Sequence, residues 1–426
     1  MALLRNQARN ILMQAGTATW TLFLMAIVAT SAGAITNDAS LEPPPELGER
    51  VSYWERIFQE YDSKTIIIHD SKDPQLILDI LPFSRMAALK SDKLLLTASG
   101  QKNVAEKYQR RYEAALRQFS KLGSEARNLG LMEDRVYQVY SKNKKAYGRL
   151  MSGTASIRQQ RGMADIFKSA AEKAQDFLPY LEMEFKAVGV PTDLTRIAFV
   201  ESMFNESAIS KVGASGMFQF MPGTAQNYMI VNQLIDERNS PIKAARAAAQ
   251  LFKSNYQDLR SWPLAVTAYN HGPAGIARAV KSLRSDYLPY LIEKWDGPSF
   301  GFASQNFYAE FIAARNSYNK AILDGSVSLR PSKLKLASGK LKQSVSLKDL
   351  AEIVELDTNE ILKFNPCINK KVASRYPQMK LPRGFELLLP VDLSQSKSQA
   401  FLTINAYLPQ KKIAYDQRTN VRRGEQ

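Results

Sequence analysis

Cysteine is nearly absent from this chain of 426 residues, which contains a single thiol, Cys367. One cysteine excludes a disulfide within the chain, and we expect Cys367 to be a small buried hydrophobic residue. Histidine is almost as scarce, since only His69 and His271 are present. Because zinc is held mainly by clustered cysteines and histidines, this composition disfavours a zinc enzyme, and we expect no metal.

Long polar or repetitive tracts are also missing, so we expect disorder only at the ends of the chain. The length suffices for two or three domains, each with its own core.

The N-terminal segment has the pattern of a secretory signal. Arg5 and Arg9 precede an apolar run centred on residues 20–28, and small residues follow at 32–34. We therefore predict a signal peptide over residues 1–34 and an exported protein, periplasmic or secreted. The strongly apolar part is shorter than the ~20 residues of a membrane span, so we expect no stable span. An uncleaved N-terminal membrane anchor is the alternative.

The chain carries a net charge of +16, and its basic residues are spread along the sequence. Such a charge suits a polyanion or an anionic cell wall. Export argues against nucleic acid as the partner. Solubility alone is the alternative explanation of the charge.

The composition of successive segments predicts a mainly α protein. We expect a helical N-terminal extension over residues 35–163, with one helix at Val104–Phe119 and one short strand at Ile66–Ile68. A helical domain follows over residues 164–325, in which a first helix is stopped by Gly189. Residues 326–339 resemble a linker, and residues 393–426 form a basic tail.

Residues 340–392 form a compact α+β unit in this interpretation. Ser346–Asp349 has the pattern of a helix cap, a second helix ends at Asn365-Pro366, and Phe385–Pro390 reads as a closing strand. This order resembles a LysM module, a small fold that binds the sugar backbone of peptidoglycan or chitin. A purely structural cap is the alternative.

A carboxylate interrupts the apolar stretch that contains Arg196–Asn205. On a helix, Glu201 falls in the middle of the face formed by four apolar residues, Leu194, Ile197, Ala198 and Phe204. Burial disfavours the charged form of a carboxylate, and so does the negative end of the helix dipole. A protonated carboxylic acid in an apolar cleft is what glycosidic cleavage needs as a general acid.

A glycine-containing segment follows ten residues later. Gly213 and Gly216 permit tight backbone turns, and large apolar residues surround one amide, Gln219. Apolar walls with a few placed hydrogen-bonding groups are typical of a sugar cleft. Met217, Phe218, Phe220 and Met221 supply those walls in this interpretation.

A third segment, Trp262–Gly272, has Pro263 at a first helical turn and Gly272 as a C-terminal cap. Tyr269 then falls in the last turn, and we expect its hydroxyl to donate to a carboxylate.

The three segments together resemble the lytic transglycosylases of the soluble, Slt-type family 1, and especially the membrane-bound D type with C-terminal LysM modules. The motifs are Glu201-Ser202, then Gly213–Gln219, then Ala268–Gly272. The resemblance covers residues 158–323, including the late motif Gly301–Phe311. It implies a goose-lysozyme-like helical fold and cleavage of peptidoglycan.

The resemblance also implies roles for individual residues. Glu201 matches the sole catalytic acid/base, and Ser210 matches a serine that hydrogen-bonds near the reacting sugar. Tyr269 matches the tyrosine that holds the catalytic glutamate, and Asn270 orders that turn.

Cleft-lining roles are implied for another four residues. Gln219 and Met221 follow the glycine motif, whereas Tyr308 and Asn306 belong to the late motif.

The motifs supply one carboxylate, whereas most glycosidases use two. Asp236 and Glu237 are nearby in sequence but read as a charge cluster at a helix end with Arg238. One carboxylate suffices if the 6-hydroxyl of N-acetylmuramic acid attacks its own anomeric carbon and closes a 1,6-anhydro ring. No metal or organic cofactor is then needed. A lysozyme that adds water and a non-catalytic wall-binding scaffold are the alternatives.

Overall fold

A computed structural model of the chain describes residues 37–390. The signal peptide predicted at 1–34 and the basic tail predicted at 393–426 lie outside these residues. The described chain divides into two compact units. The larger unit contains residues 37–334 and 365–379, and the smaller contains residues 335–364 and 380–390.

A three-stranded antiparallel sheet lies in the N-terminal part of the larger unit. The strand order is β2-β1-β3, with β1 (Thr65–Asp70) between β2 (Ile77–Pro82) and β3 (Ile157–Arg161). Every residue of β1 is buried, as expected for a central strand rich in isoleucine. The strand predicted at Ile66–Ile68 is confirmed as part of β1. The extension contains more strand than predicted, because β2 and the polar β3 pair with β1.

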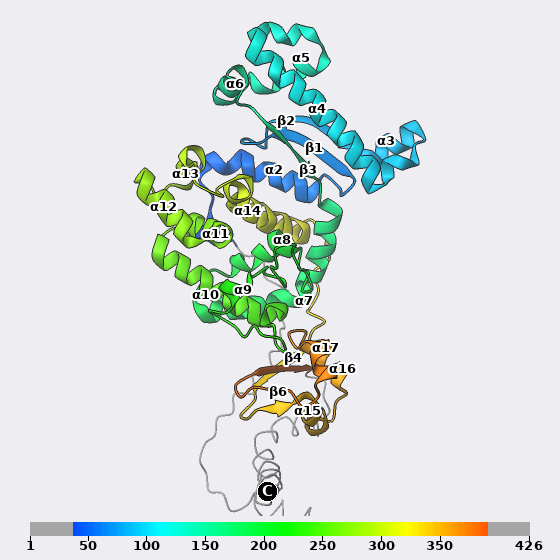
Figure 1. The fold of residues 1–426 in the computed structure, drawn as a ribbon, viewed down its shortest axis with the longest axis vertical. Helices are drawn as coiled ribbons and strands as arrows, with labels where there is room; N and C mark the ends of the chain where they lie inside the picture. Colours follow the sequence, from blue (N-terminus) through cyan, green and yellow to red (C-terminus); the bar gives the residue numbers. More distant parts are fainter. Residues whose placement is uncertain (1–36, 391–426) are drawn as a thin grey trace, which may run out of the picture. The chain divides into compact units, whose positions relative to one another are not determined.

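Helices of the extension build a separate hydrophobic core on this sheet (Figure 1). The predicted helix at 104–119 is confirmed as part of the longest of them, whose N-terminus is capped by the Thr97 hydroxyl, which accepts from the Gly100 amide at 3.0 Å. These helices are α3 (Phe83–Lys90), α4 (Ala98–Leu122), α5 (Leu131–Tyr140) and α6 (Lys144–Met151).

The second core of the larger unit is built almost entirely from helices. Helix α7 ends where predicted, at Gly189, whose φ of 79° closes the helix in the left-handed conformation. The set comprises α2 (Gly48–Gln59), α7 (Ala164–Val188), α8 (Ile197–Ser202), α9 (Pro222–Ala225), α10 (Pro241–Leu259), α11 (Trp262–His271), α12 (Pro273–Leu283), α13 (Leu288–Lys294) and α14 (Phe302–Leu323). The mainly α fold class is thus confirmed.

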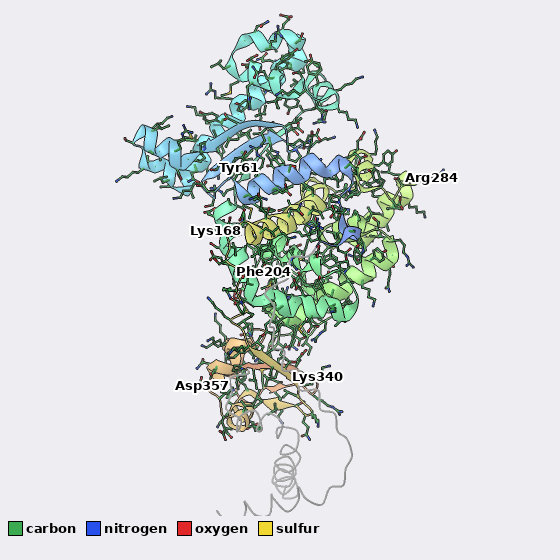
Figure 2. All side chains as sticks on the ribbon, turned by 180° about the vertical axis from the view of Figure 1, so that it is seen from behind. Tyr61, Lys168, Phe204, Arg284, Lys340 and Asp357 are labelled. Carbon is green, nitrogen blue, oxygen red and sulfur yellow. The ribbon has the colours of Figure 1, made fainter. Side chains whose placement is uncertain are left out.

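Helix α14 is the centre of this core, because it is buried on nearly every side and packs against α2, α8 and α11. Its pairing with α2 joins segments about 250 residues apart (Figure 1). The Oδ1 atom of Asn306 on α14 accepts hydrogen bonds from Arg50 at 2.9 Å and Trp54 at 3.2 Å. Helix α2 therefore belongs to the core that surrounds α14. Figure 2 shows the side chains that fill this region, with Phe204 labelled among them.

The segment that resembles a linker is held along α7 for part of its length. Arg330 forms an ion pair with Asp176, at 2.6 Å between Nη1 and Oδ1. The hydroxyl of Tyr180 donates to the carbonyl of Leu334 at 2.6 Å. The next residues, Leu336–Lys340, form β4.

The smaller unit consists of short strands and helices. β4 pairs antiparallel with β7 (Glu386–Pro390), which confirms the predicted closing strand. β5 (Val345–Ser346) pairs with β6 (Lys380–Leu381), and α15 (Leu347–Val354) and α16 (Thr358–Phe364) lie between them in sequence. The predicted cap is confirmed, since the Ser346 hydroxyl accepts from the Asp349 amide at 3.1 Å.

Residues 365–379, including α17 (Lys370–Arg375), belong to the larger unit instead. Ile368 forms a β-bridge with Ile235, and the Asp236 amide donates to the Cys367 carbonyl at 2.8 Å. Cys367 is 2% exposed and is the buried hydrophobic residue that we predicted. Across residues 37–390, no helix combines the length and apolar character of a membrane span.

Candidate active site

Glu201 lies in the last turn of the short helix α8, which continues from a 3₁₀ turn over Thr192–Arg196. Leu194, Ile197 and Ala198 are fully buried, as the apolar pattern predicted. The helix ends at Ser202, because the next two residues, Met203 and Phe204, both adopt positive φ angles, 51° and 56°. Phe204 is therefore brought into the core by a left-handed turn and not by the helix.

Two consecutive non-glycine residues in the left-handed region cost about 1–3 kcal/mol each and persist only where the surroundings hold them. Here the Ser202 hydroxyl donates to the Met217 carbonyl at 2.8 Å, and the Phe204 ring lies 4.5 Å from that of Phe199. Such strain at the end of the Glu201 helix is typical of functional sites.

The carboxyl of Glu201 is half-buried and has no hydrogen bond or ion pair with the part of the chain that the structure describes. Burial, and to a smaller extent the negative charge of Glu310, raise its pKa to about 8. The predicted direction of this shift is confirmed. At neutral pH the group is mainly protonated, so it can donate a proton.

The glycine segment folds into a tight loop beside α8. Gly213 and Gly216 have φ angles of 88° and 79°, and a Cβ on Gly216 would lie 1.8 Å from the carbonyl oxygen of Arg238. Only glycine fits there. Arg238 clamps the loop further, donating from Nη1 to the Gly213 carbonyl at 2.8 Å and to the Phe220 carbonyl at 3.1 Å.

The acidic residues beside Arg238 form the predicted charge cluster at a helix end. Arg238 pairs with Asp236 at 2.7 Å, and Lys243 pairs with Glu237 at 2.8 Å, where α10 begins. The Asp236–Arg238 pair also orients the guanidinium that clamps the loop. The sequence did not indicate this role of Arg238.

Gln219 closes the loop with its own side chain. Its Nε2 donates to the carbonyls of Ala208 at 3.1 Å and Gly216 at 2.8 Å, and its φ is 48°. Ser210 also serves the loop, because its hydroxyl accepts from the Ala214 amide at 2.9 Å.

The apolar residues around Gln219 do not form cleft walls as predicted. Met217, Phe218 and Phe220 are at most 3% exposed and pack into the helical core. The prediction failed because large apolar groups in a short loop are as well suited to anchoring it as to facing a ligand. Met221 is the exception, since it is 43% exposed.

Tyr269 lies in the last turn of α11, as predicted, but the expected hydrogen bond to a carboxylate is wrong. Its hydroxyl donates instead to the backbone carbonyl of Phe218 at 2.8 Å. The pKa of Tyr269 is raised well above its usual value, first by burial and then by the charge of Glu201. The phenol thus stays neutral close to Glu201. The exposed Asn270 accepts from the Ser304 hydroxyl at 2.8 Å, which ties α11 to α14.

The late-motif residues Tyr308 and Asn306 do not line a cleft. Both are 1% exposed, and the Tyr308 hydroxyl donates to the Leu41 carbonyl at 2.9 Å. Their prediction as substrate-binding residues is corrected because α14 is covered on this side by α2 and the turn before it. The sequence gives no local sign of that distant pairing.

Glu310, in the same late motif, is a residue that the sequence analysis overlooked. It is half-buried on α14, and burial raises its pKa to about 8. The signal was present, since Glu310 is the only acidic residue in an otherwise apolar run, Phe307–Ala314. Like Glu201, Glu310 is thus a single carboxylate among apolar neighbours on a helix.

Comparison with known proteins finds a family model that matches this region. Residues 182–287 match the model of the Transglycosylase SLT domain. Glu201, the glycine loop and Tyr269 all lie within the matched residues. In residues 37–390 no group of three or more His, Cys, Asp or Glu side chains could hold a metal ion.

Relatives of the SLT domain include a lytic enzyme. The chain is 28% identical over 112 residues to membrane-bound lytic murein transglycosylase D of Escherichia coli strain K12, covering 26% of this chain and 25% of that protein. It is 27% identical over 123 residues to a protein named for tributyltin chloride resistance from Alteromonas sp. (strain M-1), covering 28% of this chain and 59% of that protein. The chain thus spans a quarter to three fifths of these relatives.

Solved structures with similar elements are also lytic transglycosylases. The 70 kDa soluble lytic transglycosylase of Escherichia coli is 18% identical, with a TM-score of 0.27 over 50% of this chain and 29% of that one. An inactive variant of lytic transglycosylase Slt from Pseudomonas aeruginosa is 19% identical, with a TM-score of 0.30 over 58% of this chain and 38% of that one.

Proposed function

We propose that this protein is a peptidoglycan lytic transglycosylase in which Glu201 is the single acid/base. The observation that carries the proposal is a protonated, half-buried carboxyl at the strained end of α8, inside the SLT domain. The named activity of a relative, murein transglycosylase D, supports the same substrate class.

The reaction needs one proton donor that later becomes a base. Glu201 protonates the glycosidic oxygen between N-acetylmuramic acid and N-acetylglucosamine, and the C1–O4 bond breaks. The resulting carboxylate then takes the proton from the 6-hydroxyl of the same N-acetylmuramic acid. That oxygen bonds to C1 and closes a 1,6-anhydro ring, so Glu201 ends the cycle protonated. An internal nucleophile benefits from proximity and needs no bound water.

Other residues in this proposal hold the cleft or contact the glycan. The loop closed by Gln219 and Ser210 and anchored by Tyr269 sets the floor beside Glu201, and Met221 offers an exposed apolar surface to a sugar ring. Asn270 keeps its place as a substrate-binding candidate, since it is exposed at the end of α11.

The proposal extends to the rest of the chain. We propose that residues 340–392 are a LysM-like glycan-binding module, that residues 35–163 are an extension of the SLT domain, and that the protein is exported to the cell wall. The paired strands β4 and β7 with α15 and α16 between them support the module.

A lysozyme activity is the second candidate, because Glu310 supplies the additional carboxylate that hydrolysis with inversion requires. Mass spectrometry of purified sacculi digested by the protein separates the two. We expect muropeptides that end in 1,6-anhydro-N-acetylmuramic acid, whereas mainly reducing ends would favour the lysozyme.

The same assay tests whether the protein is an enzyme at all. Glu201→Gln should lower the release of muropeptides by about 10²–10⁴-fold while thermal unfolding stays cooperative. Wild-type protein that binds sacculi and releases nothing would instead indicate a binding scaffold.

A further inference from the structure

A helical hairpin at one end of the N-terminal extension exposes leucine side chains. Helix α3 is followed by a sharp turn and by a 3₁₀ turn at Lys93–Leu96, after which α4 begins. Leu89 is 77% exposed, Leu94 is 70% exposed and Leu96 is 44% exposed. Single exposed leucines are common on protein surfaces, but three within eight residues make an apolar cluster. We call this hairpin, residues 83–98, the leucine tip.

The leucine tip is an ordered part of the extension. Phe83, Ala87 and Leu95 belong to the core of the extension and are at most 7% exposed. Ser91 turns the chain in the left-handed conformation, with a φ of 51°, and the Asp92 amide donates to the Ala87 carbonyl at 3.1 Å. The exposed leucines are therefore presented by a packed hairpin.

A close backbone approach fixes the 3₁₀ turn on the first turn of α4. A Cβ on Gly100 would lie 2.0 Å from the Leu94 carbonyl oxygen, so only glycine allows the turn to lie there. The Thr97 amide donates to the same carbonyl at 3.0 Å. The backbone of Leu94 is thus held in place while its side chain is in contact with solvent.

The charged residues of the leucine tip are mostly basic. Arg85, Lys90 and Lys93 are exposed, and none of the three forms an ion pair within residues 37–390. Asp92 is the one acidic residue of the tip, and its carboxylate accepts from the Leu94 amide at 2.9 Å. The tip therefore combines exposed leucines with a net positive charge.

The opposite end of α4 exposes leucines without this charge (Figure 1). Leu129 is 56% exposed and Leu131 is 90% exposed. Residues 117–134, which surround them in sequence, contain three basic and three acidic residues. The leucine tip has three basic residues and one acidic residue. Apolar exposure is thus shared by the two ends of α4, whereas the excess of positive charge belongs to the leucine tip.

We propose that the leucine tip docks on the surface of an anionic lipid bilayer. Its leucines enter the boundary of the acyl chains, and its basic residues lie against the lipid headgroups. Apolar side chains at the acyl boundary with Lys or Arg at headgroup level are the pattern of interfacial membrane binding. This inference goes beyond the proposed function and does not depend on it.

The shape of the leucine tip favours a bilayer over an acidic protein as its partner. A stable protein interface buries about 800 Å² of each partner. The tip is a narrow hairpin that projects beyond the sheet of the extension (Figures 1 and 2), and its exposed leucines are few. A small convex apolar surface suits insertion into lipid, which needs no complementary pocket.

The test places a fluorophore on the leucine tip and on its matched control. Leu89→Cys and Leu131→Cys are each labelled with bimane in the full chain. Cys367 is 2% exposed, so the label goes to the introduced thiol. Vesicles of phosphatidylglycerol and phosphatidylethanolamine with brominated acyl chains quench a fluorophore that enters the bilayer. We expect quenching of the label at residue 89 and an unchanged signal from the label at residue 131.

Charge variants test the role of the basic residues. Each basic residue near an anionic membrane strengthens binding by about fivefold. Lys90→Gln with Lys93→Gln should therefore raise the lipid concentration for half-maximal quenching at residue 89 by about 30-fold. Lys121→Gln with Arg127→Gln, at the other end of α4, is the matched control and should leave it unchanged. Cooperative thermal unfolding of every variant establishes that it is folded.

Three results would overturn the proposal. They are equal quenching of the two labels, equal quenching by neutral phosphatidylcholine vesicles, and no quenching at residue 89 by any vesicle. The last would leave an acidic protein surface as the partner that the same charges fit. Glu201→Gln should behave as wild type in this assay, so its outcome is separate from whether the protein cleaves peptidoglycan.

Discussion

The hydroxyl of Tyr269 donates a 2.8 Å hydrogen bond to the backbone carbonyl of Phe218. This bond links the last turn of α11 to the residue just before Gln219, and Gln219 in turn closes the glycine loop. Tyr269 therefore acts on the loop through the backbone. Tyr269 interacts with Glu201 electrostatically, since the charge of Glu201 adds to the effect of burial in raising the pKa of the phenol.

Tyr269→Phe should keep the ring contacts with Phe252 and Phe307 but leave the buried Phe218 carbonyl unpaired. We expect a loss of about 1–3 kcal/mol in the free energy of unfolding and a several-fold lower rate. Urea unfolding and muropeptide release measure the two. A rate loss above a hundredfold without any loss of stability would show that the phenol acts on Glu201 directly.

Glu201→Gln should change how stability depends on pH. The folded state raises the carboxyl pKa from 4.5 to about 8, so folding favours the protonated form. That contribution is complete below about pH 4.5 and is lost as the pH rises through 8. The variant should therefore gain stability relative to wild type between pH 5 and pH 9, on the order of 2 kcal/mol.

Differential scanning calorimetry across this pH range provides the measurement. Asp286→Asn serves as the control, because Asp286 is an exposed carboxylate. A stability difference that stays constant with pH would contradict the raised pKa of Glu201.

Gly216→Ala should destabilise the protein by about 3 kcal/mol or more. Its Cβ would meet the Arg238 carbonyl at 1.8 Å, in addition to the cost of a positive φ. Gly213→Ala is the matched control, because its φ is also positive but no atom lies within 4 Å of the added Cβ. We expect a loss of only about 1 kcal/mol there. Equal losses in urea unfolding would show that the close approach is unimportant.

Tyr308→Phe tests whether Tyr308 stabilises the core and does not contact the substrate. The change removes the hydrogen bond to the Leu41 carbonyl inside the core, and about 1 kcal/mol of stability should be lost. The KM for peptidoglycan fragments should not change, since Tyr308 is buried. A raised KM with unaltered stability would restore Tyr308 to the cleft.

Sequence patterns correctly predicted those features of the structure that depend on residues close together in the chain. The burial of the apolar residues around Glu201, the helix end at Gly189 and the cap at Ser346 depend on neighbours within a few residues, and all three are confirmed. The domain boundaries remain predictions.

Long-range pairing explains what the sequence did not show. Asn306 contacts α2, a helix some 250 residues earlier, and Tyr308 contacts Leu41 in the turn before that helix. No pattern in the neighbouring sequence indicates these contacts. The polar strand β3 reads as a strand only beside β1. Glu310 could have been identified from its apolar neighbours, as Glu201 was. It was overlooked because the resemblance to the transglycosylase family implied only one catalytic carboxylate.

The backbone bonds of Cys367 and Asn369 to the loop at 234–236 have a consequence for dissecting this protein. The chain leaves the larger unit after residue 334, returns for residues 365–379 and leaves again. Truncating the protein at residue 340 would thus remove residues 365–379, which bind the loop at 234–236. Arg238, just after that loop, donates to the Gly213 carbonyl and holds the glycine loop. A shortened enzyme should keep residues 365–379, supplied in trans or joined through a short graft.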